Sequence, residues 1–288
     1  MKGIPNLDEL IRMALLEDVG DGDHSTLACI PPTAVNTAKM VAKQGGILCG
    51  MEVGERVFHF VNDSFYHSAV PMKVTCLKHD GDRVEKGDVL MLVEGASGVI
   101  LTAERTALNF IQRLSGIATE THRMVQMLEG LHTQLLDTRK TTPNMRLLEK
   151  YAVKCGGGTN HRIGLYDMVM LKDNHVDFAG GIEAAIDRTR AYLKEQGKDL
   201  KIEIEVRNLD ELEQVLQHGG VDRIMLDNFD IPTLREAVKR IDGRYETEAS
   251  GGITDATLRA YAETGVDFIS VGALTHHIKS MDISLVKG

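Results

Sequence analysis

Four segments decide the fold of this chain: KIEIEV (201–206), RIMLD (223–227), YETEAS (245–250) and DFISVG (267–272). They begin at a constant interval of 22 residues, and each has the composition of a short β-strand. The segments between them have polar caps and one apolar face, which predicts helices over 208–217, 230–240 and 254–263. Strand–helix alternation of this kind predicts a parallel sheet, and its repetition in one sense predicts a β/α barrel.

The sequence before these repeats extends the barrel and adds a second domain. Two further strands of the same kind are predicted at 134–137 and 168–171. An open doubly wound sheet would show the same alternation, but its usual glycine-rich dinucleotide-binding motif is absent. Nearer the N-terminus, short runs at 39–43, 73–77 and 89–93 predict a small β-rich domain. The apolar spacing over 103–128 then predicts a helix, with Gly116 as a bend or close-packing point.

Composition argues against several classes of protein. The chain has 288 residues with 33 Lys+Arg, 42 Asp+Glu, a formal net charge of −9 and no Trp, which argues against a nucleic-acid partner. No apolar run approaches the roughly 20 residues of a membrane span, so we expect no membrane partner. The four cysteines, Cys29, Cys49, Cys76 and Cys155, lack metal-site spacing, as expected of reduced thiols. We therefore expect a cytoplasmic protein that acts on small molecules.

The predicted strand ends are sorted by charge. Because a β/α barrel places its site at the carboxyl ends of its strands, the residues there are the candidates for chemistry. Residues 139–175 contain seven Lys or Arg and three acidic residues, a local charge of +4. The candidates are basic after the first strands, acidic at the middle strands and glycine-rich after the last two: Arg139, Lys140, His161, Arg162 and Lys172; Glu205 and Asp227; Ser250, Gly251, Gly252, Gly272 and Ala273.

Each group of candidates predicts one part of a binding site. A dense cationic pocket suits a small polyanion, and the glycine-rich turns can hold a phosphate through backbone N–H groups. Carboxylates beside them suggest Mg²⁺ carried on substrate phosphates. Each of these residues also has a purely structural alternative. The bases could be solvated surface charges, Glu205 could face outward, and Asp227 could cap a helix.

The chain resembles the quinolinate phosphoribosyltransferase family. The resemblance rests on ERTALNFIQRLSGIAT (104–119), the stretch 137–167 from DTRKTTP to GLYD, MLKDNH (170–175), IMLDNF (224–229), EASGGI (248–253) and DFISVGALTH (267–276). It extends over nearly the whole chain. It implies a pentosyltransferase of NAD biosynthesis that joins quinolinate to 5-phosphoribosyl-1-pyrophosphate, giving nicotinate mononucleotide, pyrophosphate and CO₂.

The resemblance also implies a role for each candidate. The implied quinolinate pocket consists of Arg139, His161, Arg162 and Lys172, completed by Arg105 from a second subunit. The implied pocket for phosphoribosyl pyrophosphate and its Mg²⁺ consists of Lys140, Glu205 and Asp227, with Ser250, Gly251, Gly252, Gly272 and Ala273 around the 5-phosphate. Of these, Lys140, Lys172, Glu205 and Asp227 are the implied catalytic residues, and Glu205 and Asp227 would hold the metal directly or through water.

The implied architecture is an open, incomplete β/α barrel beside an N-terminal α/β-sandwich domain. We place the sandwich domain at 1–105 and the barrel at 106–275, and expect 276–288 to pack back on the N-terminal domain. The family forms homodimers whose active site is shared between subunits. Whether Glu203 or Glu205 faces the metal is open, and no role is assigned to His276 or His277.

Three rival functions remain. The nearest is a paralogous phosphoribosyltransferase with a different acceptor. A class I aldolase would also place a lysine, here Lys172, at a barrel strand end. The stretch 79–90 resembles the β-domains that carry biotin or lipoate, although a lysine at a matching hairpin tip is missing.

Overall fold

The computed structural model describes residues 4–288, which form two compact units. The first unit contains the chain up to His122, Thr141–Gly157 and Leu274–Gly288. The second contains Arg123–Lys140 and Gly158–Ala273. The expected boundary at residue 105 falls inside a continuous helix, α4 (Ser97–Met127), most of which belongs to the first unit.

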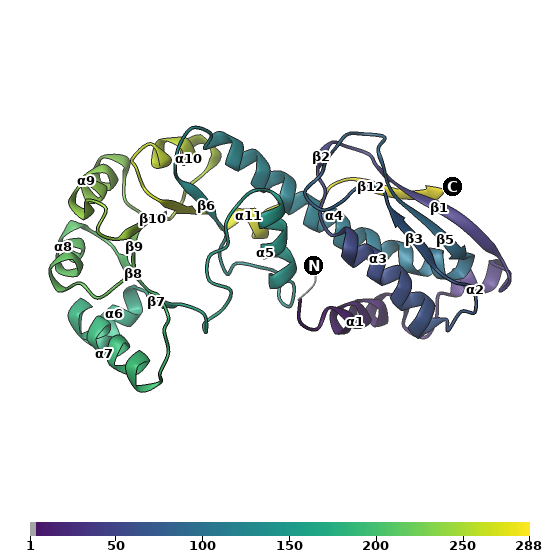
Figure 1. Cartoon of the computed structure of the whole chain (residues 1–288), viewed down its shortest axis with the longest axis horizontal. Coiled ribbons are helices and arrows are strands. Elements are labelled where there is room, and N and C mark those ends of the chain that lie inside the picture. Colours follow the sequence, from purple (N-terminus) through teal and green to yellow (C-terminus); the bar gives the residue numbers. More distant parts are fainter. Residues whose placement is uncertain (1–3) are drawn as a thin grey trace. The chain divides into compact units, whose positions relative to one another are not determined.

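The second unit is an open β/α barrel, as predicted. Its six parallel strands are β6 (Gln134–Leu136), β7 (Val169–Leu171), β8 (Ile202–Val206), β9 (Arg223–Asp227), β10 (Glu246–Ser250) and β11 (Phe268–Ser270). Their order in the sheet is β6-β11-β10-β9-β8-β7, which leaves β6 and β7 at opposite edges. The sheet therefore curves without closing, and its helices cover one side of it (Figure 1).

The helices of this unit are α6 (Asp173–Ala179), α7 (Ile182–Glu195), α8 (Leu209–His218), α9 (Ile231–Ile241) and α10 (Asp255–Ala262). Three of them, α8, α9 and α10, begin at the predicted polar caps. The Asn208 side chain accepts the N–H groups of Asp210 and Glu211, and Asp230 accepts that of Thr233. Since Asp230 caps α9, the alternative that Asp227 is its cap is wrong.

The two faces of the barrel sheet differ in chemistry because side chains alternate along a strand. On β8, Ile202, Ile204 and Val206 are buried on one face. On the opposite face Glu203 and Glu205 are also buried, with exposed fractions of 0% and 8%. The alternative that Glu205 faces outward into solvent is therefore wrong.

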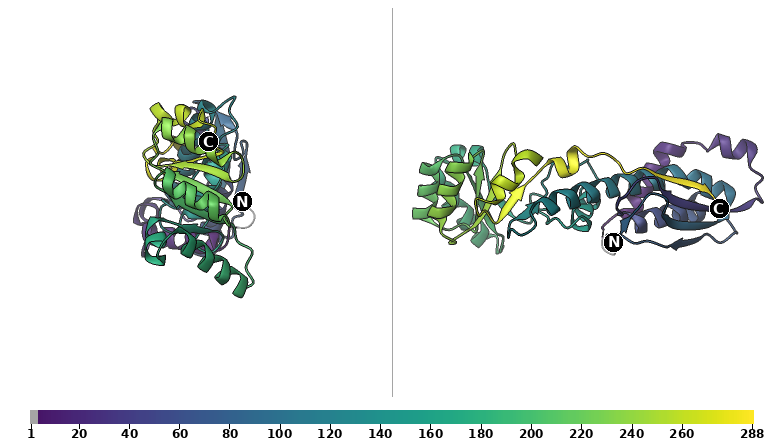
Figure 2. Two further views of the ribbon diagram at one scale, coloured as in Figure 1. Left: turned by 90° about the vertical axis from the view of Figure 1, so that its left-hand side faces the viewer. Right: turned by 90° about the horizontal axis from the view of Figure 1, so that it is seen from above.

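The first unit is built on an antiparallel sheet in the order β12-β1-β5-β3. Its strands are β1 (Val35–Ala42), β3 (Lys73–Cys76), β5 (Val89–Ala96) and β12 (Ile283–Lys287), and a second small sheet pairs β2 (Gly46–Ile47) with β4 (Arg83–Val84). The C-terminal strand β12 pairs with β1, from Ala38 opposite Lys287 to Ala42 opposite Ile283 (Figures 1 and 2). The β-rich character predicted for this region is confirmed.

Helices complete the first unit. They are α1 (Leu7–Val19), α2 (His24–Cys29), α3 (Met51–Phe60), the π-helix η1 (Val61–Phe65), α4 and α5 (Arg146–Cys155), and the short α11 (Ala273–His276) lies at the boundary. The sequence did not predict α3, which interrupts the β-rich region. The long helix α4 is confirmed, and Leu108, Ile111, Leu114 and Ile117 on its apolar side are all buried.

Gly116 is a close-packing point on α4. A Cβ atom at this position would collide with the backbone carbonyl oxygen of Lys279. A backbone segment can approach a helix this closely only where the helix carries no side chain. The glycine therefore allows the segment before β12 to cross α4.

A buried ion pair joins three segments of the first unit. Arg113 on α4 donates to Oε1 of Glu149 on α5 at 2.8 and 2.6 Å. Oε2 of Glu149 accepts the N–H of Thr142 at 3.1 Å, and Arg113 also donates to the Thr275 carbonyl at 3.1 Å. Glu149 is fully buried. The pair thus ties α4, the segment 141–157 and the C-terminal segment together.

We predict that Glu149→Ala lowers the free energy of unfolding by about 2–3 kcal/mol, because it removes a fully buried carboxylate that accepts charged hydrogen bonds, while the side chain of Arg113 is 30% exposed and keeps contact with water. Urea denaturation followed by circular dichroism measures the change. Glu9→Ala is the matched control, since Glu9 pairs with Arg12 on the exposed face of α1 and its loss should leave the midpoint almost unchanged. Equal effects of the two substitutions would contradict the assignment.

Candidate active site

The predicted site residues of the second unit lie at the edge of its sheet that is formed by the carboxyl ends of the strands. The carboxyl ends of parallel strands meet there, so the loops that follow them are neighbours. Arg139 and Lys140 follow β6, and Lys172 follows β7. Glu205 is the fourth residue of β8, Asp227 and Ser250 end β9 and β10, and Gly272 follows β11. Because β9 and β10 are in register, Asp227 and Ser250 are directly paired.

Two arginines form a concentration of like charge at this edge. Burial, together with the nearby charge of Arg139, lowers the pKa of Arg162. The guanidinium of Arg162 reaches only one weak acceptor among the hydrogen bonds identified, the Met168 carbonyl at 3.4 Å. Two guanidinium groups held close together attract an anion, and the planar fork of each suits a carboxylate. This pair is therefore a candidate anion-binding feature of the site.

Lys172 lies between the basic and acidic parts of the site. Its Nζ is 3.2 Å from Oε2 of Glu205. Burial raises the pKa of Glu205, the ion pair with Lys172 opposes this, and repulsion from Asp227 adds to it. The carboxylates of Glu205 and Asp227 therefore face the same space on neighbouring strands. A pair of carboxylates whose negative charge is only partly compensated fits a magnesium ion, which binds through one or two acidic side chains.

The turn after β10 requires glycine. Gly251 has φ +98°, and a Cβ atom there would collide with the side chain of Asn228. Asn228 itself donates its Nδ2–H to Asp227 at 2.6 Å and its backbone N–H to the Ser250 carbonyl at 2.8 Å. The turn and the Asp227 carboxylate are thus held together by Asn228. Gly252 is exposed, and Gly272 and Ala273 are partly exposed at the same edge.

His161 lies beneath this edge, and its imidazole is engaged with carboxylates. Its Nε2 is 3.0 Å from Glu203 and 3.3 Å from Glu248, both fully buried. Burial lowers the pKa of His161, but the two ion pairs outweigh it and raise the pKa to about 9. Burial and the charge of Glu248 raise the pKa of Glu203 to about 7. These shifts favour a protonated His161 between the two carboxylates.

Glu203 and Glu205 thus differ in their surroundings. Glu203 faces His161 inside the barrel, whereas Glu205 lies beside Lys172 and Asp227. Of the two, Glu205 is therefore the one placed with the other candidate metal ligand.

Several residues of this region were missed at the sequence level. Asp137 is fully buried and accepts the backbone N–H of His161 at 2.9 Å and Nδ2–H of Asn160 at 2.6 Å. Its place directly after β6 was the signal that could have identified it. Glu248 follows from strand alternation, because it lies two residues before Ser250 on the same face. Asn228 gave no signal, since its role depends on the close approach of Gly251.

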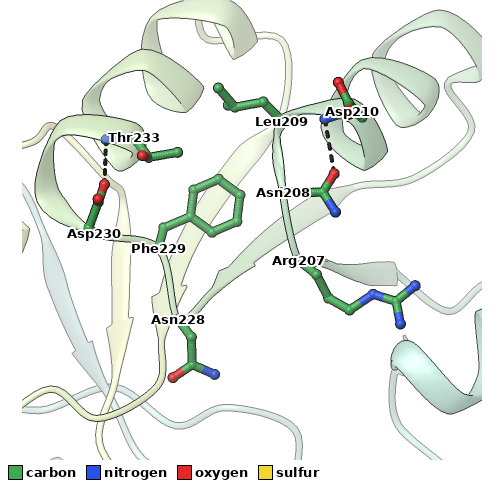
Figure 3. Close-up of a pocket in the computed structure, with 8 residues that line it drawn as sticks. All are labelled: Arg207, Asn208, Leu209, Asp210, Asn228, Phe229, Asp230 and Thr233. Atoms are coloured by element: carbon green, nitrogen blue, oxygen red, sulfur yellow. Dashed lines mark hydrogen bonds between the residues drawn. The ribbon is translucent and has the colours of Figure 1, made fainter.

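A cavity of about 440 Å³ lies between the loops that follow β8 and β9 (Figure 3). Its lining residues are Arg207, Asn208, Leu209, Asp210, Asn228, Phe229, Asp230 and Thr233. The helix N-termini at its wall already hydrogen-bond to Asn208 and Asp230, so their N–H groups are not available to bind a phosphate. The cavity shares only Asn228 with the surroundings of the predicted site residues.

Three predicted or unassigned residues belong to the first unit. Arg105 is exposed on α4 beside Glu104. His276 and His277 are exposed, with ring centroids 6.4 Å apart.

We predict that stability falls as the pH rises from about 6.5 to 9. The pKa of His161 is raised above its unfolded value, so its contribution is complete below pH 6.5 and is lost as the pH passes 9, a change of about 3 kcal/mol. Thermal unfolding across this range should show a much flatter profile for His161→Gln. The exposed His277→Gln is the control and should keep the wild-type slope, and a wild-type slope in His161→Gln would refute the assignment.

Comparison with known proteins gives the family. The model of the quinolinate phosphoribosyl transferase N-terminal domain matches residues 23–115, and the model of its C-terminal domain matches residues 117–286. A chloroplastic nicotinate-nucleotide pyrophosphorylase (carboxylating) of Arabidopsis thaliana is 42% identical over 97% of this chain and 82% of its own length. A probable nicotinate-nucleotide pyrophosphorylase (carboxylating) of Bacillus subtilis is 40% identical over 97% of this chain and 92% of its own length.

Solved structures agree with this result. The nicotinate-nucleotide pyrophosphorylase of Francisella tularensis superposes with a TM-score of 0.91 at 40% identity, covering 99% of this chain and 98% of that chain. Within residues 4–288, no helix is both long and apolar enough to cross a membrane. The two domain models, the full-length relatives and the shared fold lead to one conclusion: this chain belongs to the quinolinate phosphoribosyl transferase family.

Proposed function

We propose that this protein transfers the phosphoribosyl group of 5-phosphoribosyl-1-pyrophosphate to quinolinate, with decarboxylation, to give nicotinate mononucleotide, pyrophosphate and CO₂. The observation that carries the proposal is the pair of Arg139 and Arg162, whose like charges lie close enough to lower the pKa of Arg162. Quinolinate has two adjacent carboxylates, and such a dianion needs several cations in one pocket. Membership of the family supports the same reaction.

The basic residues would bind and orient quinolinate. Arg139, Arg162 and Lys172 lie at one edge of the sheet and match the dianion in charge. Held by its two carboxylates, the ring would present its nitrogen to the sugar carbon that bears pyrophosphate. We place His161 beneath this pocket as part of its floor, because its Nε2 is directed at Glu203 and Glu248.

The other end of the site would bind phosphoribosyl pyrophosphate. Glu205 and Asp227 would hold Mg²⁺, directly or through water, and the ion when bound neutralises charge on the pyrophosphate. Lys140 would add positive charge near the same leaving group. The turn Ser250–Gly252 and the pair Gly272 and Ala273 offer backbone N–H groups for the 5-phosphate. As the C–O bond to pyrophosphate breaks, the quinolinate nitrogen forms the new bond to the sugar.

Decarboxylation then needs no base. Once the ring nitrogen carries the sugar it is a pyridinium, and its positive charge stabilises the electron pair that the breaking carbon–carboxylate bond leaves on the adjacent ring carbon. CO₂ leaves, and this carbon takes up a proton from water. The contribution of the protein to this step is to keep the ring bound by its remaining carboxylate.

Incubation with quinolinate, phosphoribosyl pyrophosphate and Mg²⁺ should yield nicotinate mononucleotide and CO₂, measured by chromatography and trapping of labelled CO₂. Lys172→Ala should lower kcat/KM roughly 100- to 1,000-fold, the size expected when one group that binds developing or substrate charge is lost. Lys198→Ala, an exposed lysine after α7, should retain full activity. A Lys172→Ala protein with wild-type turnover and quinolinate affinity would exclude this role. Activity with a different acceptor alone would instead identify a paralogous transferase.

We further propose a homodimer in which Arg105 completes the quinolinate pocket of the partner subunit. Arg105 supports this by its position, exposed on α4 four residues after Leu101, so that both share one face of the helix. The side chain of Leu101 is 44% exposed and lines a groove of about 320 Å³ whose lining mixes apolar and polar residues. An exposed apolar side chain beside a base is suited to contact with a second copy.

A heterodimer of Arg105→Ala and Arg139→Ala subunits should regain about half of the wild-type activity, because one of its two sites receives both arginines intact. Each homodimer should be nearly inactive. The control heterodimer of Arg139→Ala and Arg162→Ala should stay inactive, since both changes affect the pocket of their own subunit. Purification through two different affinity tags provides the heterodimers, and failure of the first pair to recover would refute a shared site.

We also propose that the protein works in the cytoplasm. The four cysteines are free thiols, which is compatible with a reducing compartment.

A further inference from the structure

A largely buried ionic cluster lies inside the barrel, and the reaction proposed above uses only its histidine, as part of the pocket floor. The cluster consists of His161, Glu203, Arg223, Glu246 and Glu248. Glu203, Arg223 and Glu246 are in register at one level of the sheet. Glu248 lies one level nearer the carboxyl ends of the strands, where it is in register with Glu205 through Met225. The cluster therefore begins beside Glu205 and extends about 6–7 Å below it. Barrel interiors at this depth are usually packed with branched apolar side chains. Charged residues in this layer therefore call for a specific explanation.

The carboxylates of the cluster are paired with basic side chains. Arg223 donates to Glu248 at 3.1 Å and to Glu246 at 3.0 Å, and its guanidinium stacks over the ring of Phe268 at 4.0 Å. Lys201 pairs with Glu246 at 3.1 Å at the outer end. The three carboxylates thus face Arg223, Lys201 and the imidazole of His161.

The geometry of the cluster disfavours a metal ion. One ligand atom from each of His161, Glu203 and Glu248 lies within 4.8 Å of the others, an arrangement that could hold a cation. However, Arg223 already lies 3.1 Å from Glu248, and Nε2 of His161 lies 3.0 and 3.3 Å from Glu203 and Glu248 as their ion-pair partner. A divalent ion would be repelled by Arg223 and would have to break the ion pairs of His161.

Three consecutive residues, Asn160, His161 and Arg162, connect the cluster to the proposed quinolinate pocket. Asp137 accepts the backbone N–H of His161 and the Nδ2–H of Asn160, the ring of His161 is paired with Glu203 and Glu248, and Arg162 is the next residue along the chain. Both the backbone and the ring of His161 are therefore anchored immediately before Arg162. Asp137 in turn lies two residues before Arg139.

We propose that Glu248 is a positioning residue for quinolinate binding: by holding the ring of His161, it fixes Arg162 beside Arg139. The proposal rests on the function proposed above. Two like charges repel, and a loop without an anchor would let them separate. The contacts of His161 hold the two arginines close together in the folded protein before any ligand binds. Less of the binding free energy is then needed to overcome their repulsion.

Glu248→Gln tests the proposal, with Glu246→Gln as its matched control. Both glutamates lie on β10 and pair with Arg223, but the ion pair with His161 is made by Glu248. Glu248→Gln should raise the Kd and KM for quinolinate roughly 10-fold, the lower end of the effect of residues that orient a ligand-binding group. Its kcat at saturating quinolinate and its KM for phosphoribosyl pyrophosphate should change less than about twofold. Glu246→Gln should keep the wild-type quinolinate affinity.

A double-mutant cycle tests whether the effect passes through Arg162. In an Arg162→Ala background, Glu248→Gln should cause no further loss of quinolinate affinity by calorimetry. Independent losses in the two backgrounds, or equal losses for Glu246→Gln and Glu248→Gln, would overturn the proposal.

Crystal structures of the two variants separate this inference from the proposed function. The guanidinium of Arg162 should be displaced in Glu248→Gln and unmoved in Glu246→Gln, whether or not the wild-type protein binds quinolinate. If wild-type protein bound no quinolinate, the proposed function would fail while this structural comparison would still decide the positioning role. An unmoved Arg162 in Glu248→Gln would overturn it.

Discussion

The close approach of Arg139 and Arg162 is the physical constraint around which the proposed quinolinate pocket of the second unit is arranged. Two neighbouring guanidinium groups favour binding of a ligand with matching negative charge. Because they repel each other, other residues must fix their positions. Asp137 holds the backbone of the loop that carries Arg162, and Glu203 and Glu248 hold the ring of His161. The buried carboxylates therefore support the positive charge presented at the edge of the sheet.

The barrel sheet can meet this constraint because its two faces serve different purposes. One face carries Ile202, Ile204 and Val206 on β8 and equivalent residues on its neighbours, and its burial stabilises the unit. The other face carries ion pairs in the layer where apolar packing is usual. Because the sheet is open between β6 and β7, the loop 158–168 can enter and supply His161 from outside the strand–helix repeat.

Local patterns predicted the repeating part of the fold well. The strands, the helix starts at Asn208 and Asp230, and the apolar side of α4 depend on neighbours within a few residues, which a sequence displays directly. The helix α3 was missed, because it lies within a region whose other segments have strand character. Asp137 and Glu248 were also missed as members of the site region. Their importance comes from contact with His161, which is 24 and 87 residues away in sequence.

The sequence by itself determined the alternation of strands and helices, the cluster of bases over 139–175, the carboxylates of the middle strands and, through long motifs, the family. Only the tertiary structure decided which carboxylate does what: Glu203 faces His161 inside the barrel, and Glu205 faces Lys172 at the edge. It also decided that 141–157 and the C-terminal segment join the first unit, through Glu149 and β12. The physical reason is that strand alternation places both Glu203 and Glu205 on the same face of the sheet, so the sequence pattern does not distinguish them. Their burial and their charged partners are set by segments that are distant in sequence.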